Sequence, residues 1–159
     1  MEEVEASVRV KGATKENHAV LGGWILCEFD MDWSKRHDTM GAAWILKDEN
    51  GRVLEHSRRA FSDVKTVGEA KLQMWLWVME SMKSLRKKKV RFVSTFGDYR
   101  ELQGFEAWEL RIGSPVTVRC ASLIAQSVMS LGLTQSCVAV GHPRWLDHLY
   151  ASERNSSDG

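Results

Sequence analysis

Four acidic side chains stand where predicted strands end or predicted helices begin: Asp30, Glu69, Asp98 and Asp147. Ligand sites in open α/β sheets lie beyond the carboxyl ends of parallel strands, so acids carried on such ends can converge. A group of carboxylates repels itself unless it is protonated or holds cations, and Mg²⁺ is the usual cation with oxygen ligands. The four acids therefore predict a divalent metal site.

Each acid also has a purely structural interpretation. A carboxylate in the first turn of a helix interacts favourably with the helix dipole, which would account for Glu69 and Asp147. Asp98 can cap the N-terminus of a helix, and Asp30 or the nearby Asp32 can open a turn. On this alternative the chain is an α/β binding domain without a metal site.

The elements that would position these acids begin with three strands. The apolar run that starts at Trp24 leads into Asp30, and two further runs, residues 40–48 and 52–61, follow it. Asn50 and Gly51 between the second and third runs are a hairpin-turn signal. Short loops between successive strands predict an antiparallel meander.

A long helix and a fourth strand come next. Leu72, Leu76 and Met79 recur at helical spacing over residues 66–89, as do Trp75, Val78 and Met82, which predicts a broad apolar face. Glu69 precedes Leu72 and Leu76 at the same spacing, so it is predicted on the side that faces the core. Residues 90–96 resemble a buried strand. Because a helix separates this strand from the meander, we expect it to run parallel to the first strand through a crossover connection.

The rest of the chain is predicted as a short helix over 97–111, a longer helix opened by Ser114 and Pro115, a fifth strand over 136–141 and a closing helix over 144–153. This order predicts one α/β domain. We expect a five-stranded mixed sheet in the order 3-2-1-4-5, with helices on both faces. The domain would span residues 23–153, after a loosely ordered lead-in over 1–22 and before a polar tail over 154–159.

Composition narrows the classes of function. With 159 residues, 43% of them hydrophobic, the chain can bury the core of one globular domain. A net charge of +1 gives no overall attraction to nucleic acid or membrane, so a basic binding surface has to be local. The sequence lacks the P-loop, GxGxxG and GxSxG patterns of the commonest enzyme classes.

The cysteines and the apolar runs bear on the compartment. Cys27, Cys120 and Cys137 are odd in number and lack CxxC spacing, which favours a reduced intracellular compartment and argues against a metal–thiolate site. No apolar run reaches the length of a membrane span, so no membrane partner is expected. We expect a monomer.

Two groups of basic residues are candidates for contacting a nucleic acid. Arg58 and Arg59 lie on the predicted third strand, where they could follow a phosphate backbone. Lys87 and Lys88 lie at the end of the long helix, where favourable interaction with the helix dipole is the alternative explanation.

Taken in order, the motifs resemble a known family. "CEFDMDW" after Trp24, "GAAWILKDENGRVL", "GEA", "FGDYREL" and "LDHLYA" are similar in order and spacing to motifs of the ribonuclease H fold. Within that fold, the chain resembles the reverse-transcriptase-like ribonuclease H domains abundant in plant genomes. The similarity covers about residues 23–153.

The resemblance implies hydrolysis of the RNA strand of RNA–DNA hybrids with two Mg²⁺ or Mn²⁺ ions. It carries Asp30, Glu69, Asp98 and Asp147 onto the four metal ligands of active family members, with Asp30 bridging both ions. His142 corresponds to a loop histidine that assists proton transfer or product release.

The chain departs from the family pattern at four positions near these acids: Glu28, Met31, Pro143 and Leu146. Met31 and Leu146 replace small residues, and their bulk would crowd a site that must admit a phosphate. These departures favour an alternative in which the chain is a catalytically inactive ribonuclease H-like module that binds nucleic acid or a protein partner.

Overall fold

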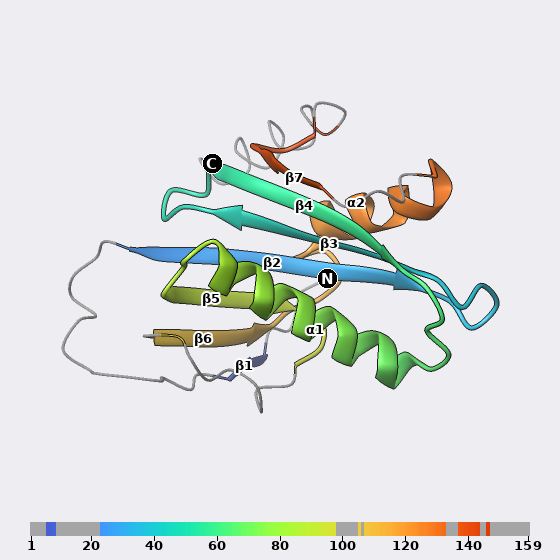
Figure 1. Cartoon of the computed structure of the whole chain (residues 1–159). Coiled ribbons are helices and arrows are strands. Elements are labelled where there is room, and N and C mark those ends of the chain that lie inside the picture. The colour runs from blue at the N-terminus through green and yellow to red at the C-terminus, as the bar shows by residue number, and fades with distance from the viewer. Residues whose placement is uncertain are drawn as a thin grey trace.

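One seven-stranded mixed sheet forms the centre of the molecule (Figure 1). The computed structural model describes residues 6–8, 23–97, 105, 107–132, 137–143 and 146. Along the sheet the strands follow the order β1-β6-β5-β2-β3-β4-β7. Their bounds are β1 (Ala6–Val8), β2 (Trp24–Trp33), β3 (Met40–Lys47), β4 (Val53–Phe61), β5 (Lys89–Ser94), β6 (Ala107–Ile112) and β7 (Cys137–Val140). The two helices are α1 (Val67–Ser84) and α2 (Arg119–Ser130). The predicted α/β class is confirmed.

The predicted meander is present. β2 pairs antiparallel with β3, and β3 pairs antiparallel with β4. The turn between β3 and β4 contains Gly51 at a φ of 81°, a conformation that glycine adopts without steric cost. The Asp48 carboxylate accepts hydrogen bonds from the backbone N–H groups of Asn50 and Arg52, each at 2.9 Å, which fixes this turn.

The predicted adjacency of the first and fourth strands is also correct. β5 pairs with β2 in parallel, and α1 forms the crossover between the meander and β5. As a result, β2 lies between an antiparallel neighbour and a parallel neighbour at the middle of the sheet (Figure 1).

The predicted place of the fifth strand is wrong. β7 forms within the expected segment, but it pairs antiparallel with β4 at the far edge of the sheet. The position beside β5 is taken by β6, in a parallel pairing. β6 occupies residues predicted as helix, although Trp108 and Leu110 alternate with Glu109 and Arg111 at the period of a strand.

The strand β1 lies in the predicted lead-in over residues 1–22 and pairs antiparallel with β6. The predicted closing helix over 144–153 lies outside the described residues except for Leu146, which is buried. No helix in the described part of the chain is long and apolar enough to cross a membrane.

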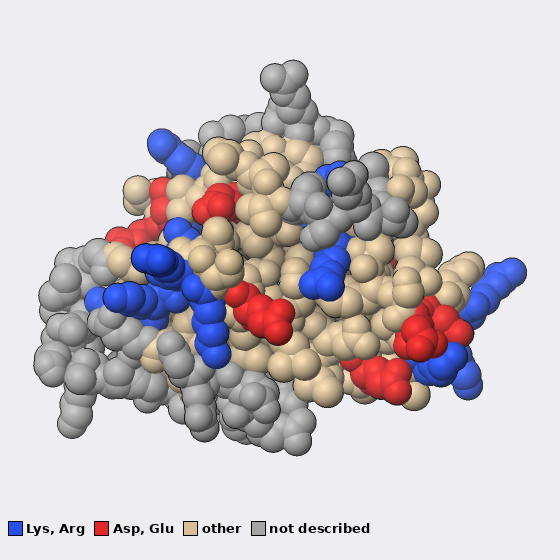
Figure 2. All heavy atoms as spheres, in the orientation of Figure 1, with Lys and Arg blue, Asp and Glu red and all other residues tan. Residues whose placement is uncertain are grey.

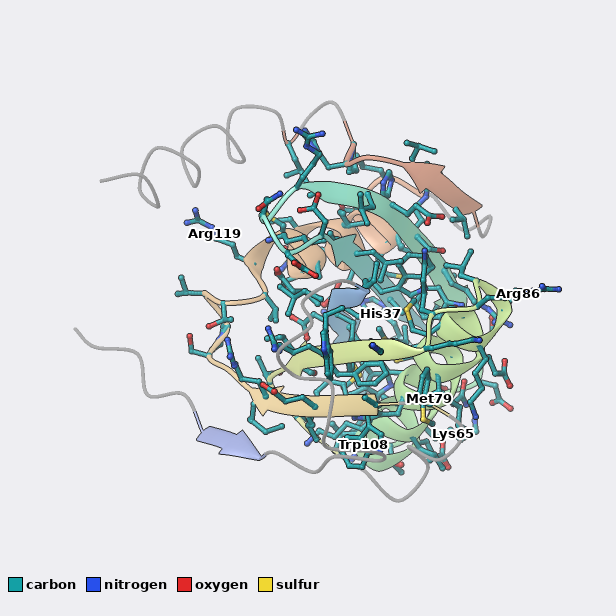
Figure 3. All side chains as sticks on the ribbon, turned by 90° about the vertical axis from the view of Figure 1, so that its left-hand side faces the viewer. His37, Lys65, Met79, Arg86, Trp108 and Arg119 are labelled. Carbon is teal, nitrogen blue, oxygen red and sulfur yellow. The ribbon has the colours of Figure 1, made fainter. Side chains whose placement is uncertain are left out.

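The helices cover opposite faces of the sheet, as expected. Figure 3 places α1 on one side of the strands and the start of α2, marked by Arg119, on the other. Alternate residues of each strand point to opposite faces, so Ala42 and Trp44 of β3 pack under α1 while Ala43 and Ile45 pack under α2.

The larger core lies under α1 and is rich in aromatic side chains. Phe29 of β2 packs edge to face against Trp75 of α1, with ring centroids 4.7 Å apart, and against Phe92 of β5 at 6.5 Å. Met79 of α1 and Trp108 of β6, both marked in Figure 3, belong to the same core. These contacts join β2, β5 and β6 to the helix that precedes β5.

The face of α1 that packs on this core agrees with the prediction for Trp75, Val78, Met79 and Met82 but not for Leu72 and Leu76. Leu72 is 45% exposed and Leu76 is 39% exposed, whereas Met74, Trp75 and Val78 are buried. The Trp and Met positions bury more apolar area than the two leucines, so they determine the orientation of the helix. Glu69, predicted on the core-facing side, is exposed.

α2 begins later than predicted. Residues Ser114 and Thr117 form a turn in which the Thr117 N–H donates to the Ser114 carbonyl at 3.0 Å. The helix starts at Arg119 after Val118, and no side chain caps its N-terminus. α2 then crosses β3 so closely that a Cβ on Gly41 would stand 2.2 Å from the Ala125 carbonyl oxygen.

Candidate functional site

Asp30 lies on the central strand β2, at the point where its pairing with β5 has ended but its pairing with β3 continues. The parallel pairing of β2 with β5 ends at Glu28, opposite Val93, while the antiparallel pairing with β3 continues to Trp33. Asp30 therefore does not end its strand, contrary to expectation. It instead lies just beyond the last pair with β5, where β2 has a strand neighbour on one side only.

The side chain of Asp30 points to the face that α2 covers. Asp30 pairs across the strands with Ala43, which packs under α2, and its carboxylate accepts a hydrogen bond from the Ser122 hydroxyl of that helix. Burial raises the pKa of Asp30 above its ordinary value, and the nearby Asp32 raises it further. The hydrogen bonds from the Met31 backbone and from Ser122 act in the opposite direction.

The raised pKa of Asp30 shows that its surroundings disfavour the ionised carboxylate. Removing a carboxylate from water disfavours its charged form, and a bound cation offsets that cost. Asp30 is thus a half-buried acid whose ionised form is disfavoured, and a carboxyl group perturbed in this way is a candidate functional residue. The contact with Ser122 could not be predicted from the sequence, because it depends on how α2 packs over β2.

Glu69 lies at the N-terminus of α1 and forms part of its cap. The Thr66 hydroxyl oxygen accepts a hydrogen bond from the Glu69 N–H at 3.1 Å, and the Glu69 Oε2 accepts one from the Lys65 N–H at 3.0 Å. This reciprocal arrangement is close to a capping box, whose T-x-x-E pattern is visible in the sequence. The structural interpretation of Glu69 is therefore realised, and its Oε2 already has a partner.

The other two predicted ligands, Asp98 and Asp147, lie outside the described residues. The described chain leads up to Asp98, since β5 ends at Ser94 and the segment after it is described as far as Gly97. Among the described residues, no three His, Cys, Asp or Glu side chains form a group that could hold a metal ion.

A buried ion pair shares the face of β2 that carries Asp30. The Lys47 Nζ lies 2.6 Å from the Glu28 Oε1, and both side chains are largely shielded from water. Glu28 stands where the ribonuclease H pattern has Asn, and the sequence alone did not supply its partner. Because a buried charge is costly without an opposite charge, Lys47 explains how this departure from the pattern is accommodated.

His142 follows β7, the edge strand that pairs with β4. The His56 Nδ1 donates a hydrogen bond to the carbonyl oxygen of Gly141, next to His142. Burial lowers the pKa of His56, and the positive charges of Arg58 and His142 lower it further. The described contacts thus place His142 beside His56 rather than beside Asp30.

The two candidate arginines lie on opposite faces of the sheet. Arg58 pairs with Ala43, under α2, whereas Arg59 pairs with Ala42, under α1. The guanidinium of Arg59 stacks over the Phe61 ring at 4.5 Å. Adjacent residues of a strand cannot follow one phosphate backbone together, so the two arginines serve different surfaces.

Basic side chains gather where α1 ends and β5 begins, at the left of Figure 2. Lys83, Arg86 and Lys88 are exposed there, and Lys87 is half-exposed. Arg86 adopts a φ of 59° as the helix stops, and the Lys87 N–H donates to the Met82 carbonyl at 2.9 Å. This termination projects the cations of the turn outward, as the labelled Arg86 shows in Figure 3.

Comparisons with models of known protein families, with curated proteins and with solved structures give no match.

Proposed function

We propose that the chain is a metal-dependent nuclease of the ribonuclease H type, which cleaves the RNA strand of RNA–DNA hybrids. The observation that carries this proposal is the position of Asp30. It lies on the central strand, just beyond the parallel pairing of β2 with β5, and its carboxylate is half-buried with a raised pKa. The arrangement of β4, β3, β2 and β5 supports the resemblance, since it follows the expected 3-2-1-4 order.

The residues present suit a hard divalent cation. The proposed ligands are the four carboxylates Asp30, Glu69, Asp98 and Asp147, and oxygen ligands are those that Mg²⁺ and Mn²⁺ prefer. Two such ions, held by these carboxylates, would supply an activated water and stabilise the leaving oxygen. Asp30 contributes a carboxylate whose ionised form lacks a compensating charge, and Ser122 orients it through its hydrogen bond.

Substrate binding is proposed for the exposed basic turn between α1 and β5. Lys83, Arg86, Lys87 and Lys88 concentrate positive charge in a chain whose net charge is only +1. Phosphate contacts of this kind hold a nucleic acid without reading its sequence, and they weaken as salt increases. The proposed partner is therefore the backbone of the hybrid or of an RNA.

A second candidate is a ribonuclease H-like module that binds nucleic acid or protein without cleaving it. The cap of α1 favours this candidate, because Glu69 uses Oε2 to accept the Lys65 N–H. A metal ligand that also caps a helix has to change partners or bind metal through its other oxygen. The bulk of Met31, next to Asp30, also favours the candidate.

Cleavage of an end-labelled RNA–DNA hybrid tests the proposal. With Mg²⁺ or Mn²⁺, the wild-type chain is expected to cut the RNA strand, and chelation with EDTA is expected to abolish cutting. Asp30→Asn removes one charge with little change of shape and is expected to eliminate the product. Asp32→Asn, which removes a charge from the same strand, is the matched control and is expected to retain cleavage.

Two outcomes would contradict the proposal. If the folded wild-type chain releases no product with either metal, the non-cleaving module is the better account. If Asp30→Asn cuts as fast as the wild type, any nuclease activity comes from another site or from a contaminant.

A further inference from the structure

A second cluster of polar side chains lies at the β4–β7 edge, on the face that α2 covers. His56 pairs with Ile45 of β3, and Arg58 pairs with Ala43, so both side chains share the face of Asp30. Ala43 and Ile45 are completely buried beneath α2 and Leu146. Arg58 lies across Ala43 from Asp30 and is not among the charged groups that act on Asp30, so we treat the two groups as separate sites.

The segment after β7 is fixed to this edge by two hydrogen bonds. The Gly141 N–H donates to the Leu54 carbonyl at 2.8 Å, and the His56 Nδ1 donates to the Gly141 carbonyl. Gly141 has a φ of 73°, which turns the chain out of the strand. His142, the next residue, is consequently held close to the charges of β4.

Among the described residues, the Arg58 Nε has no hydrogen-bond partner. This atom is enclosed by protein. A buried donor without a partner costs free energy, and such groups in native proteins are usually satisfied by water or by a ligand. Arg58 as a residue is partly exposed, so a ligand can approach its side chain from outside.

The charged side chains that share the face of His56 at this edge are basic, whereas Glu55, which pairs with Val140, lies on the opposite face of β4. The charged side chains that act on His56 are Arg58 and His142, and both disfavour its protonation. No carboxylate among the described residues is found to act on His56. A guanidinium beside a second basic side chain suits a planar or tetrahedral oxyanion, and arginine binds phosphate through two parallel hydrogen bonds.

We propose that Arg58 and His142 bind a phosphate group at the β4–β7 edge, with His56 as the positioning residue that fixes the segment bearing His142. The phosphate can belong to a free anion or to a nucleic-acid backbone, since the same atoms recognise both. This site is separate from Asp30 and requires no metal, so it does not depend on the nuclease proposal.

Titration with inorganic phosphate in metal-free buffer tests the site. Calorimetry on the wild-type chain is expected to show saturable binding, and the histidine ring signals in an NMR titration are expected to shift with the same midpoint. Arg58→Gln is expected to abolish binding. Arg59→Gln, which removes the same charge from the adjacent residue on the opposite face, is expected to leave the affinity unchanged.

Arg58→Lys keeps the positive charge, and it provides a second test if Arg58→Gln does not fold. It cannot present the guanidinium fork, so phosphate should bind about tenfold more weakly or worse. Wild-type chain that shows no saturable binding would overturn the proposal. Equal loss of affinity in Arg58→Gln and Arg59→Gln would also overturn it, since the effect would then be one of net charge.

A competition experiment identifies the source of the phosphate. A short single-stranded RNA without terminal phosphates is added to the phosphate-bound chain. Displacement that Arg58→Gln abolishes supports the site and assigns it to a nucleic-acid backbone. Phosphate binding that the RNA does not displace supports the site as one for a free phosphate or a terminal phosphate.

Discussion

Asp30 and Glu69 were predicted for the same role, and their surroundings differ. Asp30 is half-buried, with a raised pKa and one hydroxyl donor, whereas Glu69 is exposed and caps a helix. The sequence contained the signal for the cap, because Thr66 and Glu69 have the spacing of a capping box. It contained no signal for Ser122, since a contact between a strand and a helix ninety residues later depends on tertiary packing.

The pKa of Asp30 leads to a prediction about stability and pH. A carboxyl group whose pKa is higher in the folded state than in the unfolded state binds more protons when folded. Its contribution to the free energy of unfolding therefore falls as pH rises from the ordinary aspartate pKa of about 3.9 through the raised folded value. The Asp30→Asn variant has no titrating carboxyl group at this position, so its free energy of unfolding does not decrease with pH for this reason. The side-chain carbonyl oxygen of the asparagine can still accept the Ser122 hydrogen bond.

We expect Asp30→Asn to gain stability relative to wild type as pH rises through that window, and to be at least as stable at pH 7. Urea unfolding of both proteins from about pH 3 to pH 7 measures the difference. Ser122→Ala is the matched comparison, since it removes a donor that favours the ionised carboxylate and should steepen the loss. A stability difference that does not vary with pH would contradict the assignment of a raised pKa to Asp30.

At the scale of elements, the sequence predicted those with strong local patterns. The meander with its Asn50–Gly51 turn, the long helix and the parallel fourth strand are all present. The errors arose where two patterns competed. On α1, Leu72 and Leu76 were included in the predicted apolar face together with Trp75 and Met79 although they are exposed, and on β6 the alternation of Trp108 and Leu110 was missed.

The contact between α2 and β3 gives a prediction at this scale. Gly41→Ala would place a Cβ 2.2 Å from the Ala125 carbonyl oxygen and 2.9 Å from the Val128 Cβ, so α2 has to move away from the sheet. Forced repacking of this kind typically costs about 1–3 kcal/mol. Because α2 carries Ser122, we also expect the environment of Asp30 to change.

Gly68→Ala is the control for this substitution. Gly68 lies in the first turn of α1, where an added Cβ meets only the Thr66 hydroxyl oxygen at 3.9 Å. Alanine there should leave stability unchanged or raise it by about 0.4–1 kcal/mol. Thermal unfolding of the two variants compares them, and a Gly41→Ala protein as stable as Gly68→Ala would refute the close packing of α2 on β3.

For the molecule as a whole, the sequence predicted the class and the middle of the sheet but not its edges. The residues of β7 form a strand, as expected, yet a strand pattern does not specify which free edge it joins. Both edges of the β4-β3-β2-β5 arrangement were open to a further strand, and β6 and β7 occupy one each. That choice depends on contacts distant in the sequence, and it determines that His142 lies beside β4.

The proposed nuclease activity requires that Asp30 binds a divalent metal ion. Thermal unfolding with and without metal tests this binding and does not require the chain to cleave a substrate. A ligand that binds only the folded state adds about 2.7 kcal/mol to the free energy of unfolding when present at a hundredfold excess over its Kd. For a chain of this size that corresponds to a rise in Tm of roughly 5–10 °C. Sodium chloride at equal ionic strength controls for general screening.

We predict that saturating Mg²⁺ or Mn²⁺ raises the Tm of the wild-type chain by this amount. Asp30→Asn should have the same Tm as metal-free wild type, or a higher one, and should respond little to either metal. A wild-type Tm that ignores both metals, together with a lower Tm for Asp30→Asn, would contradict the account and make Asp30 a structural residue.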